Sequence, residues 1–271
     1  MKAEECQAVA AGFEAKKCLP NCLGAIACTH LKIRKPQRLW SEAYRDRTGL
    51  HSMVLQAVVD AHGNFLATSC GAFGSRPDSR VYDDSAFSGM VRKKCWLQTP
   101  TKRITYLSAT TPPREVEYLL TPYILGDAAY TESLSVVVPY PGRDDAHSDT
   151  QKLFNCCHSS TRMTVEQAIG RLKGRWQFLW QEVGVNVVEL PHFVNACIIM
   201  HNLCENEGMA CDEMDVLKAE FDERRYRAGL RKPAGQEEEA DAAEPDAGGC
   251  SQRRALADYL MHCKNVGRLH A

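Results

Sequence analysis

Glu166 is the strongest candidate for a chemical role in this 271-residue sequence, judged by its residue type and its setting. It lies at the edge of an apolar stripe in the segment 158–176, HSSTRMTVEQAIGRLKGRW, and Arg171, Lys173 and Arg175 occupy the opposite flank. A carboxylate in this setting is either a salt-bridged surface residue or a metal ligand beside a phosphate-binding face. The pattern alone leaves both interpretations open.

Two aspartates are the next candidates. Asp127 follows the apolar run Tyr118–Leu125, which predicts a strand. Open α/β sheets place ligands at the carboxyl ends of their strands, although a turn role for Asp127 is the alternative. Asp78 or Ser79 precedes a predicted helix over residues 80–91 and would cap it.

A cysteine and histidine group is the last candidate. Cys197, His201 and Cys204 fall at i, i+4 and i+7 on one face of a predicted helix over Leu190–Asn206, which has Pro191 in its first turn. This spacing fits zinc, but a fourth ligand is not nearby in the sequence. We therefore favour a core face with a hydrogen-bonded histidine.

The helix that carries Glu166 has a clear buried face. Its apolar residues recur with the helical period, at Val165, Ile169, Leu172, Trp176 and Leu179. Gly170 costs this helix about 1 kcal/mol relative to alanine, so we expect a sheet or a ligand to approach closely beside it. The segment Ser148–Cys157 predicts a separate helix before this one.

Strands are predicted mainly in the first 70 residues. Leu23–Ile33 is a buried run, and His51–Val59 and Asn64–Cys70 form a hairpin around the turn Asp60–Gly63. Val136–Tyr140 predicts a further short strand, whereas residues 95–120, with three prolines, predict no clear element. Strands followed by helices in this order predict an α/β fold, with a mixed sheet and helices on its faces.

The connection between the first two strands is basic. Residues 32–47 carry six Lys or Arg residues, including Lys35 and Arg38, with Trp40 and Tyr44 interleaved. Such a segment either contacts a nucleic-acid backbone or is a solvated surface loop.

Composition excludes several classes of protein. With 44% apolar and 25% charged residues the chain is globular, and no apolar run approaches the roughly 20 residues that span a bilayer. The first residues lack a signal-peptide pattern, so we expect an intracellular protein without a membrane segment. Its thirteen cysteines lack paired CxxC motifs, and we expect buried or free thiols instead of a disulfide framework.

Five blocks of the sequence, in order, resemble the Harbinger transposase-derived nucleases of the PIF/Harbinger DDE superfamily. They are LPNCLGAIACTH, GSRPDSRVYDDSAF, YILGDAAY, FNCCHSSTRMTVEQAIGRLKGRWQFL and NACIIMHNLCENEG, within residues 13–208. The resemblance implies a ribonuclease-H-like core that binds a divalent metal, Mg²⁺ or Mn²⁺, and cleaves DNA. It implies catalytic roles for Asp127 and Glu166, metal binding by these two and Asp78, and phosphates near Arg171, Lys173 and Arg175. It also implies a location in the nucleus, with the cytoplasm as second choice.

The first strand departs from the family pattern. The family reads Gly-x-Ile-Asp-Gly-Thr-His or close to it, but residues 24–30 here are Gly-Ala-Ile-Ala-Cys-Thr-His, so Ala27 replaces the first catalytic aspartate. Alanine cannot anchor a metal ion, and we expect impaired cleavage unless Asp60, which also suits the hairpin turn, substitutes for it. The alternative is a catalytically silent, domesticated transposase that serves as a nuclear DNA- or protein-interaction module.

The resemblance also implies a domain organisation. A nuclease domain over residues 21–210 follows a short lead, residues 1–20, in which the family's helix-turn-helix region is absent. We expect either a separate DNA-binding partner protein that supplies that region or a truncated transposon relic. Residues 211–232 predict a helical extension, 233–250 an acidic disordered linker, and 251–271 a short helix or tail.

Overall fold

The computed structural model describes residues 3–37, 40–93, 100–107, 112, 114–142, 144–230 and 247–269. Its helices are α1 (Ala3–Lys17), α2 (Asp78–Asp84), α3 (Ala86–Arg92), α4 (Asp149–Arg175), α5 (Leu190–Asn206), α6 (Glu213–Leu230) and α7 (Ala247–Asn265). Its strands are β1 (Cys22–Lys32), β2 (Ser52–Val59), β3 (Phe65–Phe73), β4 (Lys102–Leu107), β5 (Glu115–Leu120), β6 (Tyr123–Leu125) and β7 (Val136–Val137). Short 3₁₀ turns cover Ser41–Tyr44, Asp144–Ala146 and Gln177–Leu179.

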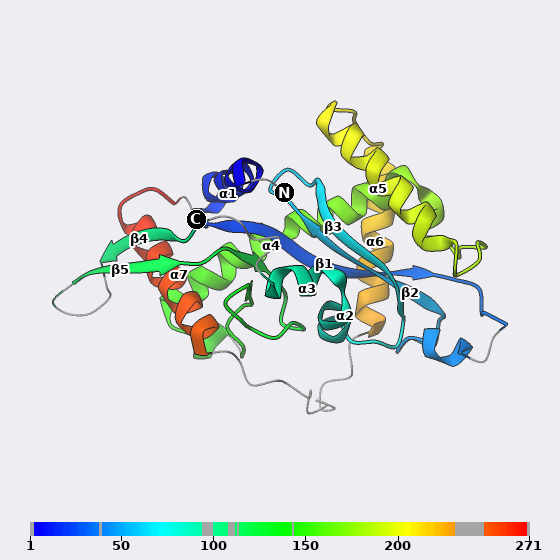
Figure 1. Ribbon diagram of the computed structural model, residues 1–271, viewed down its shortest axis with the longest axis horizontal. Coiled ribbons are helices and arrows are strands. Elements are labelled where there is room, and N and C mark those ends of the chain that lie inside the picture. The colour runs from blue at the N-terminus through cyan, green and yellow to red at the C-terminus, as the bar shows by residue number, and fades with distance from the viewer. Residues whose placement is uncertain are drawn as a thin grey trace. The chain divides into compact units, whose positions relative to one another are not determined.

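Five strands form a mixed sheet in the order β3-β2-β1-β6-β7 (Figure 1). The pairs β1–β6 and β6–β7 are parallel, whereas β2 and β3 are antiparallel. The strands β4 and β5 form a separate antiparallel pair. This arrangement confirms the predicted α/β fold with a mixed sheet.

The chain divides into two compact units. Unit 1 consists of Met1–Ile26, Met90–Thr164 and Ala242–Ala271, and unit 2 consists of Ala27–Gly89 and Val165–Asp241. Strand β1 and helix α4 contribute residues to each unit.

Unit 1 is built around β6, β7 and three helical segments. Helix α1 buries Cys6 and Phe13, and α7 buries Leu256 and Leu260 while packing along β4 and β7 (Figure 1). Gln252 of α7 is fully buried, and its side-chain amide donates a 2.9 Å hydrogen bond to the carbonyl of Leu134. Helix α7 is therefore a part of the core, and it begins four residues before the segment 251–271 for which a short helix or tail was predicted.

Unit 2 contains the predicted hairpin. Strand β2 is buried along its whole length, and the Asp60 carboxylate accepts hydrogen bonds from the backbone N–H groups of His62 (2.8 Å) and Asn64 (2.9 Å). Gly63 completes the turn with a φ of +93°, a value that favours glycine. These contacts confirm the turn role of Asp60. Helix α5 packs along β3 (Figure 1).

Two helix predictions were wrong in their boundaries. The segments 148–157 and 158–176 form one 27-residue helix, α4. The helix predicted over 80–91 is instead two short helices, because Ser85 ends α2 and its hydroxyl accepts the backbone N–H of Ser88 at the start of α3. Asp78 is the first residue inside α2 and Pro77 holds the cap position, so the predicted capping role of Asp78 is also wrong.

Strand predictions also needed correction. The run Tyr118–Leu125 divides between β5 and β6, and only two residues of Val136–Tyr140 form a strand. The β4–β5 hairpin lies in the region for which the sequence predicted no element. Most of the predicted linker 233–250 lies outside the described residues, while 247–250 form the start of α7.

The described cysteines are all free thiols. Over the same residues, each helix is too short or too polar to cross a membrane.

Candidate active site

Asp127 stands two residues beyond the carboxyl end of β6. It is half-buried, and its Oδ1 accepts a 3.0 Å hydrogen bond from the backbone N–H of Ala129. A side chain on the preceding Gly126 would meet Val136 Cγ1 at 3.0 Å, so the backbone is closely packed there. The turn role of Asp127 is therefore confirmed, whereas its role in binding a ligand at the strand end stays a prediction.

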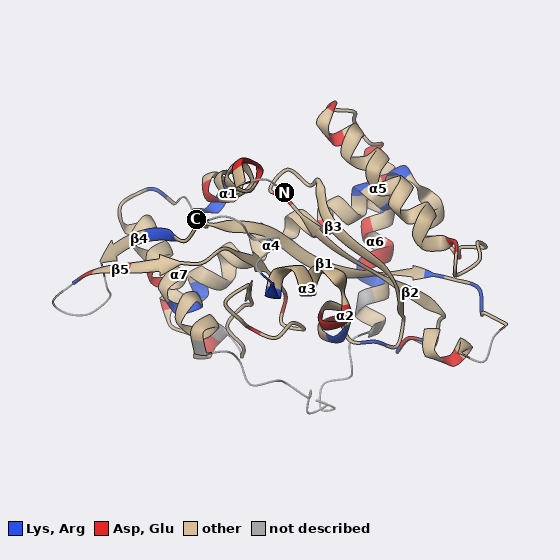
Figure 2. Ribbon diagram, viewed as in Figure 1, with Lys and Arg blue, Asp and Glu red and all other residues tan. Residues whose placement is uncertain are grey.

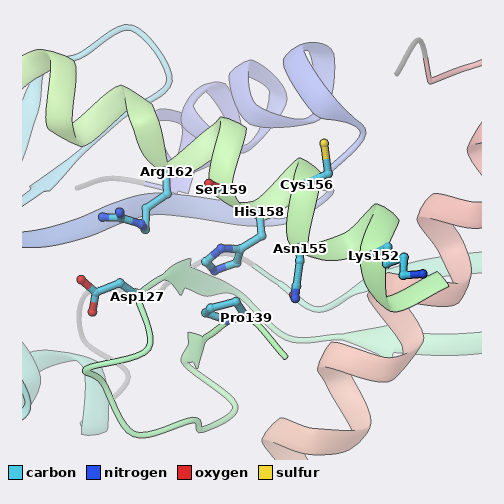
Figure 3. A pocket seen from close by; sticks show the side chains of 8 residues that line it. All are labelled: Asp127, Pro139, Lys152, Asn155, Cys156, His158, Ser159 and Arg162. Carbon is cyan, nitrogen blue, oxygen red and sulfur yellow. The ribbon is translucent and has the colours of Figure 1, made fainter. Parts of the chain in front are cut away.

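A cavity of about 540 Å³ lies beside Asp127 in unit 1 (Figure 3). Helix α4 supplies most of its lining, and Asp127 and Arg162 lie toward one end while Lys152 lies at the other. The lining residues are Asp127, Pro139, Lys152, Asn155, Cys156, His158, Ser159 and Arg162. The α4 members recur at intervals of three and four residues and therefore share one helical face.

His158 lies between the two ends of this cavity as a buried, neutral imidazole. It is 2% exposed, and its Nε2 donates a hydrogen bond to the carbonyl of Val137 at 3.2 Å. Burial lowers the pKa of His158 from 6.5 to about 4, and the charge of Arg162 acts in the same direction. The ring is therefore neutral near pH 7, and it ties α4 to the end of β7.

The opposite wall of the cavity is held by side chains from two helices. Asn155 of α4 accepts the backbone N–H of Tyr140 at 2.8 Å and donates to its carbonyl at 3.2 Å. Arg253 of α7 donates to the carbonyl of Pro139 at 3.1 Å and pairs with Glu132 at 2.8 Å. Burial raises the pKa of Glu132, while the Arg253 charge opposes that shift. These contacts keep the cavity wall in place without a ligand.

The other acidic candidates and Ala27 belong to unit 2. Ala27 in β1 is 1% exposed, and Asp78 and Glu166 are both half-buried. Glu166 follows Arg162 by four residues on the uninterrupted helix α4.

The basic connection after β1 carries its charges partly in surface ion pairs. Lys and Arg residues follow the carboxyl end of β1 in Figure 2. Lys35 is exposed and pairs with Glu42 at 2.9 Å, and Arg34 pairs with Glu182 at 3.4 Å. Arg38 lies outside the described residues. The phosphate contact of Lys35 and Arg38 stays a prediction.

Three cations of α4 have protein partners in unit 2. Lys173 is 4% exposed, and its ammonium donates to Glu223 at 2.7 Å and to Thr29 Oγ1 at 2.8 Å. Arg171 and Arg175 both pair with Glu205, at 3.2 Å and 2.8 Å. These ion pairs give the three side chains a structural role, and their predicted phosphate contact stays a prediction.

Gly170 has a different use from the one predicted. A side chain there would meet Glu220 Cγ at 2.9 Å, and one at Gly174 would meet the backbone N of Val216 at 3.1 Å. Helix α6 is therefore the element that approaches α4 at these glycines, whereas a sheet or a ligand was expected beside Gly170.

The cysteine and histidine face of α5 belongs to the core. Cys197 and His201 are buried, and His201 Nε2 donates to the carbonyl of Gly63 at 3.3 Å. Arg175 donates to the other ring nitrogen, also at 3.3 Å. Burial lowers the pKa of His201 to about 4, although Glu205 opposes the shift. The hydrogen-bonded core histidine that we favoured over a zinc site is confirmed.

The described side chains do not complete a metal site of the kind the family resemblance implies. Over these residues no group of three or more His, Cys, Asp or Glu side chains is arranged to hold a metal ion. Metal binding by Asp78, Asp127 and Glu166 stays a prediction.

Sequence reasoning missed the α4 residues that accompany Asp127 in the cavity. They are Lys152, Asn155, Cys156, His158, Ser159 and Arg162. The signal was present, because a single helix over 149–175 places them on one face. Dividing that helix at residue 158 concealed the common face.

Comparison with known proteins adds the following. A family described as "DDE superfamily endonuclease" matches residues 26–202. "Protein ALP1-like" of Arabidopsis thaliana is 30% identical over 200 residues, which cover 70% of this chain and 45% of that protein. "Putative nuclease HARBI1" of Rattus norvegicus is 23% identical over 194 residues, 70% of this chain and 48% of that protein. The chain spans about half the length of the curated relatives it matches, and no solved structure gives a significant match.

Proposed function

The chain belongs to the DDE superfamily endonucleases, and from this membership we propose that it is a divalent-metal-dependent DNA endonuclease domain impaired by Ala27. The matched region contains Ala27, Asp127 and Glu166. Relatives of the chain in rat and human carry the name "Putative nuclease HARBI1", in agreement with a transposase-derived nuclease.

The observation that carries the proposal is the register between β1 and β6. These parallel strands pair Ala25 with Leu125. Two residues further along each segment stand Ala27 and Asp127. Position 27 lies inside β1, and the family pattern has an aspartate there as well as the one that follows β6, where paired carboxylates hold metal ions for phosphodiester cleavage. The chain has one carboxylate where the family has two.

The metal ions of such a site activate the attacking water and stabilise the leaving oxygen. Because the described side chains do not complete a donor set, we assign no step to a metal in this chain. The backbone N–H of Ala129 holds Asp127 in a turn, and burial keeps the His158 ring neutral in the same cavity. The positive charge of Arg162 lies at the same end of the cavity as Asp127 (Figure 3). Positive charge there favours a substrate phosphate.

The test compares nicking of supercoiled plasmid in Mn²⁺ by the parent, Ala27→Asp, and Ala27→Asp combined with Asp127→Asn. We expect weak or absent nicking by the parent, nicking by Ala27→Asp, and its loss in the double variant. Ala27→Asn is the matched control, because it adds a polar group of the same size without a charge, and it should not nick. Nicking by Ala27→Asp that survives Asp127→Asn would contradict the proposal.

Ala27 also favours a second candidate function, a catalytically silent module that binds DNA or protein partners in the nucleus, with a separate DNA-binding protein. For this function the carboxylates are dispensable, so Glu166→Gln should leave partner binding unchanged. A folded Ala27→Asp variant that fails to nick would favour this candidate over the nuclease.

A further inference from the structure

We propose that the cavity along α4 is a track for the sugar-phosphate backbone of one DNA strand, with Lys152 at its outer end and Arg162 at the end beside Asp127. The proposal rests on the proposed function, since it states how the endonuclease site receives its substrate. It concerns residues of unit 1 alone.

The length of the track follows from the helix. Lys152 and Arg162 are ten residues apart on α4, and Asn155, Cys156 and Ser159 lie between them on the same face (Figure 3). At 1.5 Å of rise per residue the two cations are separated by about 15 Å along the helix, which exceeds the distance between neighbouring phosphates of one strand. The two charges therefore contact different phosphates.

The charges along the cavity favour an anionic chain. Its described lining contains two cations and one acid, and that acid, Asp127, lies at the end where the chemistry would occur. His158 adds no charge near pH 7, because burial keeps it neutral. The exposed Ser159 hydroxyl is available as a neutral donor on the same face.

Size and composition point to one strand, bound through its backbone. The volume of about 540 Å³ is that of a small-ligand pocket, which accommodates a short piece of one strand but not the width of a duplex. None of the described lining residues is Phe, Tyr or Trp, and the one ring among them, that of His158, is buried, so base stacking adds little. Binding should therefore depend steeply on salt and weakly on sequence.

The track needs little rearrangement to receive a strand. Asn155 and Arg253 hold its wall at Tyr140 and Pro139 by direct hydrogen bonds. A binding surface that is already in place loses less conformational entropy when the ligand arrives.

Cys156 provides a direct readout. It is the one exposed thiol among the described cysteines, and it lies in the middle of the track. The full chain is alkylated with iodoacetamide in EDTA, with and without a mixed-sequence single-stranded DNA oligonucleotide, and modification of each cysteine is followed by mass spectrometry. We expect the oligonucleotide to slow alkylation of Cys156 about tenfold or more at saturation and to leave the half-buried Cys18 unaffected.

Charge variants test the same site by fluorescence anisotropy. Lys152→Gln and Arg162→Gln should each weaken oligonucleotide binding about three- to tenfold and lower the salt slope by about 0.7. Lys264→Gln removes an exposed charge of α7 in the same unit, outside the cavity, and should change neither value. Ser159→Asp, at an exposed position, should weaken binding further than a neutral substitution because it places a negative charge in the track.

Several results would overturn the proposal. One is an alkylation rate of Cys156 that does not change when the oligonucleotide is bound. Another is protection of Cys156 by duplex DNA, or by inorganic phosphate at the same phosphate concentration, that equals the protection by the oligonucleotide. A third is a loss of oligonucleotide affinity that is the same for Lys152→Gln and Lys264→Gln. The nuclease proposal fails separately, through the nicking assay with Ala27→Asp. Nicking by that variant without protection of Cys156 would reject the track and keep the nuclease.

Discussion

Mild acid should destabilise unit 1 through His158. The imidazole is buried, and its pKa is lowered from 6.5 to about 4, so the folded protein binds its proton only at lower pH than the unfolded chain does. The stabilisation is complete above pH 6.5 and is lost as the pH falls from 6.5 towards 4. Between about pH 7.5 and about pH 5 the linkage relation gives a loss of about 2 kcal/mol from this one group.

The assay is urea unfolding of the parent and of His158→Gln at both pH values. Glutamine retains an N–H donor for the carbonyl of Val137 but does not titrate. His201, which is also buried with a lowered pKa, is present in both proteins, so its contribution cancels in the difference. The parent should lose about 2 kcal/mol more than the variant between the two conditions.

An equal loss in parent and variant would refute this reasoning, because it would mean that His158 titrates alike in the folded and unfolded chains. A lower stability of His158→Gln at neutral pH alone would leave it intact. That effect would report only the packing and hydrogen bonding of the ring.

Glu223→Gln should lower the free energy of unfolding, measured in urea, by about 3 kcal/mol, because it leaves the buried Lys173 ammonium without its counter-charge. Replacing both Glu223 and Lys173 by methionine should recover most of that loss. Gly174→Ala should lower the melting temperature, since its methyl group meets the backbone of α6. Gly170→Ala should leave the melting temperature unchanged or raise it, since its methyl group meets only the flexible side chain of Glu220. Equal changes in melting temperature would contradict the helix contact. Asp60→Ala should cost about 1–2 kcal/mol, measured by urea unfolding, because two backbone N–H groups of the hairpin turn lose their acceptor.

The elements that could be predicted from sequence are those whose burial is uniform. β1 and β2 are buried along almost their whole lengths, and their apolar runs and the Asp60–Gly63 turn located them. The β4–β5 hairpin was missed because its burial alternates and its outward positions carry a mixture of Arg, Thr, Glu and Leu residues. A half-exposed strand of mixed composition resembles a loop in sequence.

The division of α4 has a local cause. Residues 156–161 are Cys, Cys, His, Ser, Ser and Thr, all weak helix formers. A tertiary contact overrides this preference, since His158 bonds the end of β7, whereas the Thr161 hydroxyl bonds the carbonyl of Cys157 within the helix itself. Sequence propensity does not include such contacts.

The candidate site was predictable only in part, for the same reason. Asp127 follows a strand, and that position could be predicted from the apolar run before it. Its neighbours in the cavity depend on the continuity of α4, and the roles given to Lys173 and Arg175 ignored the acids of α5 and α6 that pair with them. Long-range ion pairs leave no periodic signal in a single sequence.

The discontinuity of unit 1 has a consequence for synthesis on the ribosome. All segments of unit 2 have been synthesised once residue 241 has left the exit tunnel. Unit 1 is complete only after α7 has been synthesised, because Leu256 and Leu260 of α7 are part of its core. Segments made at the start of translation therefore remain without their last packing partner until its end. A premature stop between residues 241 and 247 would remove α7 and leave all segments of unit 2 present. The product would lack Arg253, which holds the cavity wall in unit 1. It would keep the β2–β3 hairpin, α5 and α6.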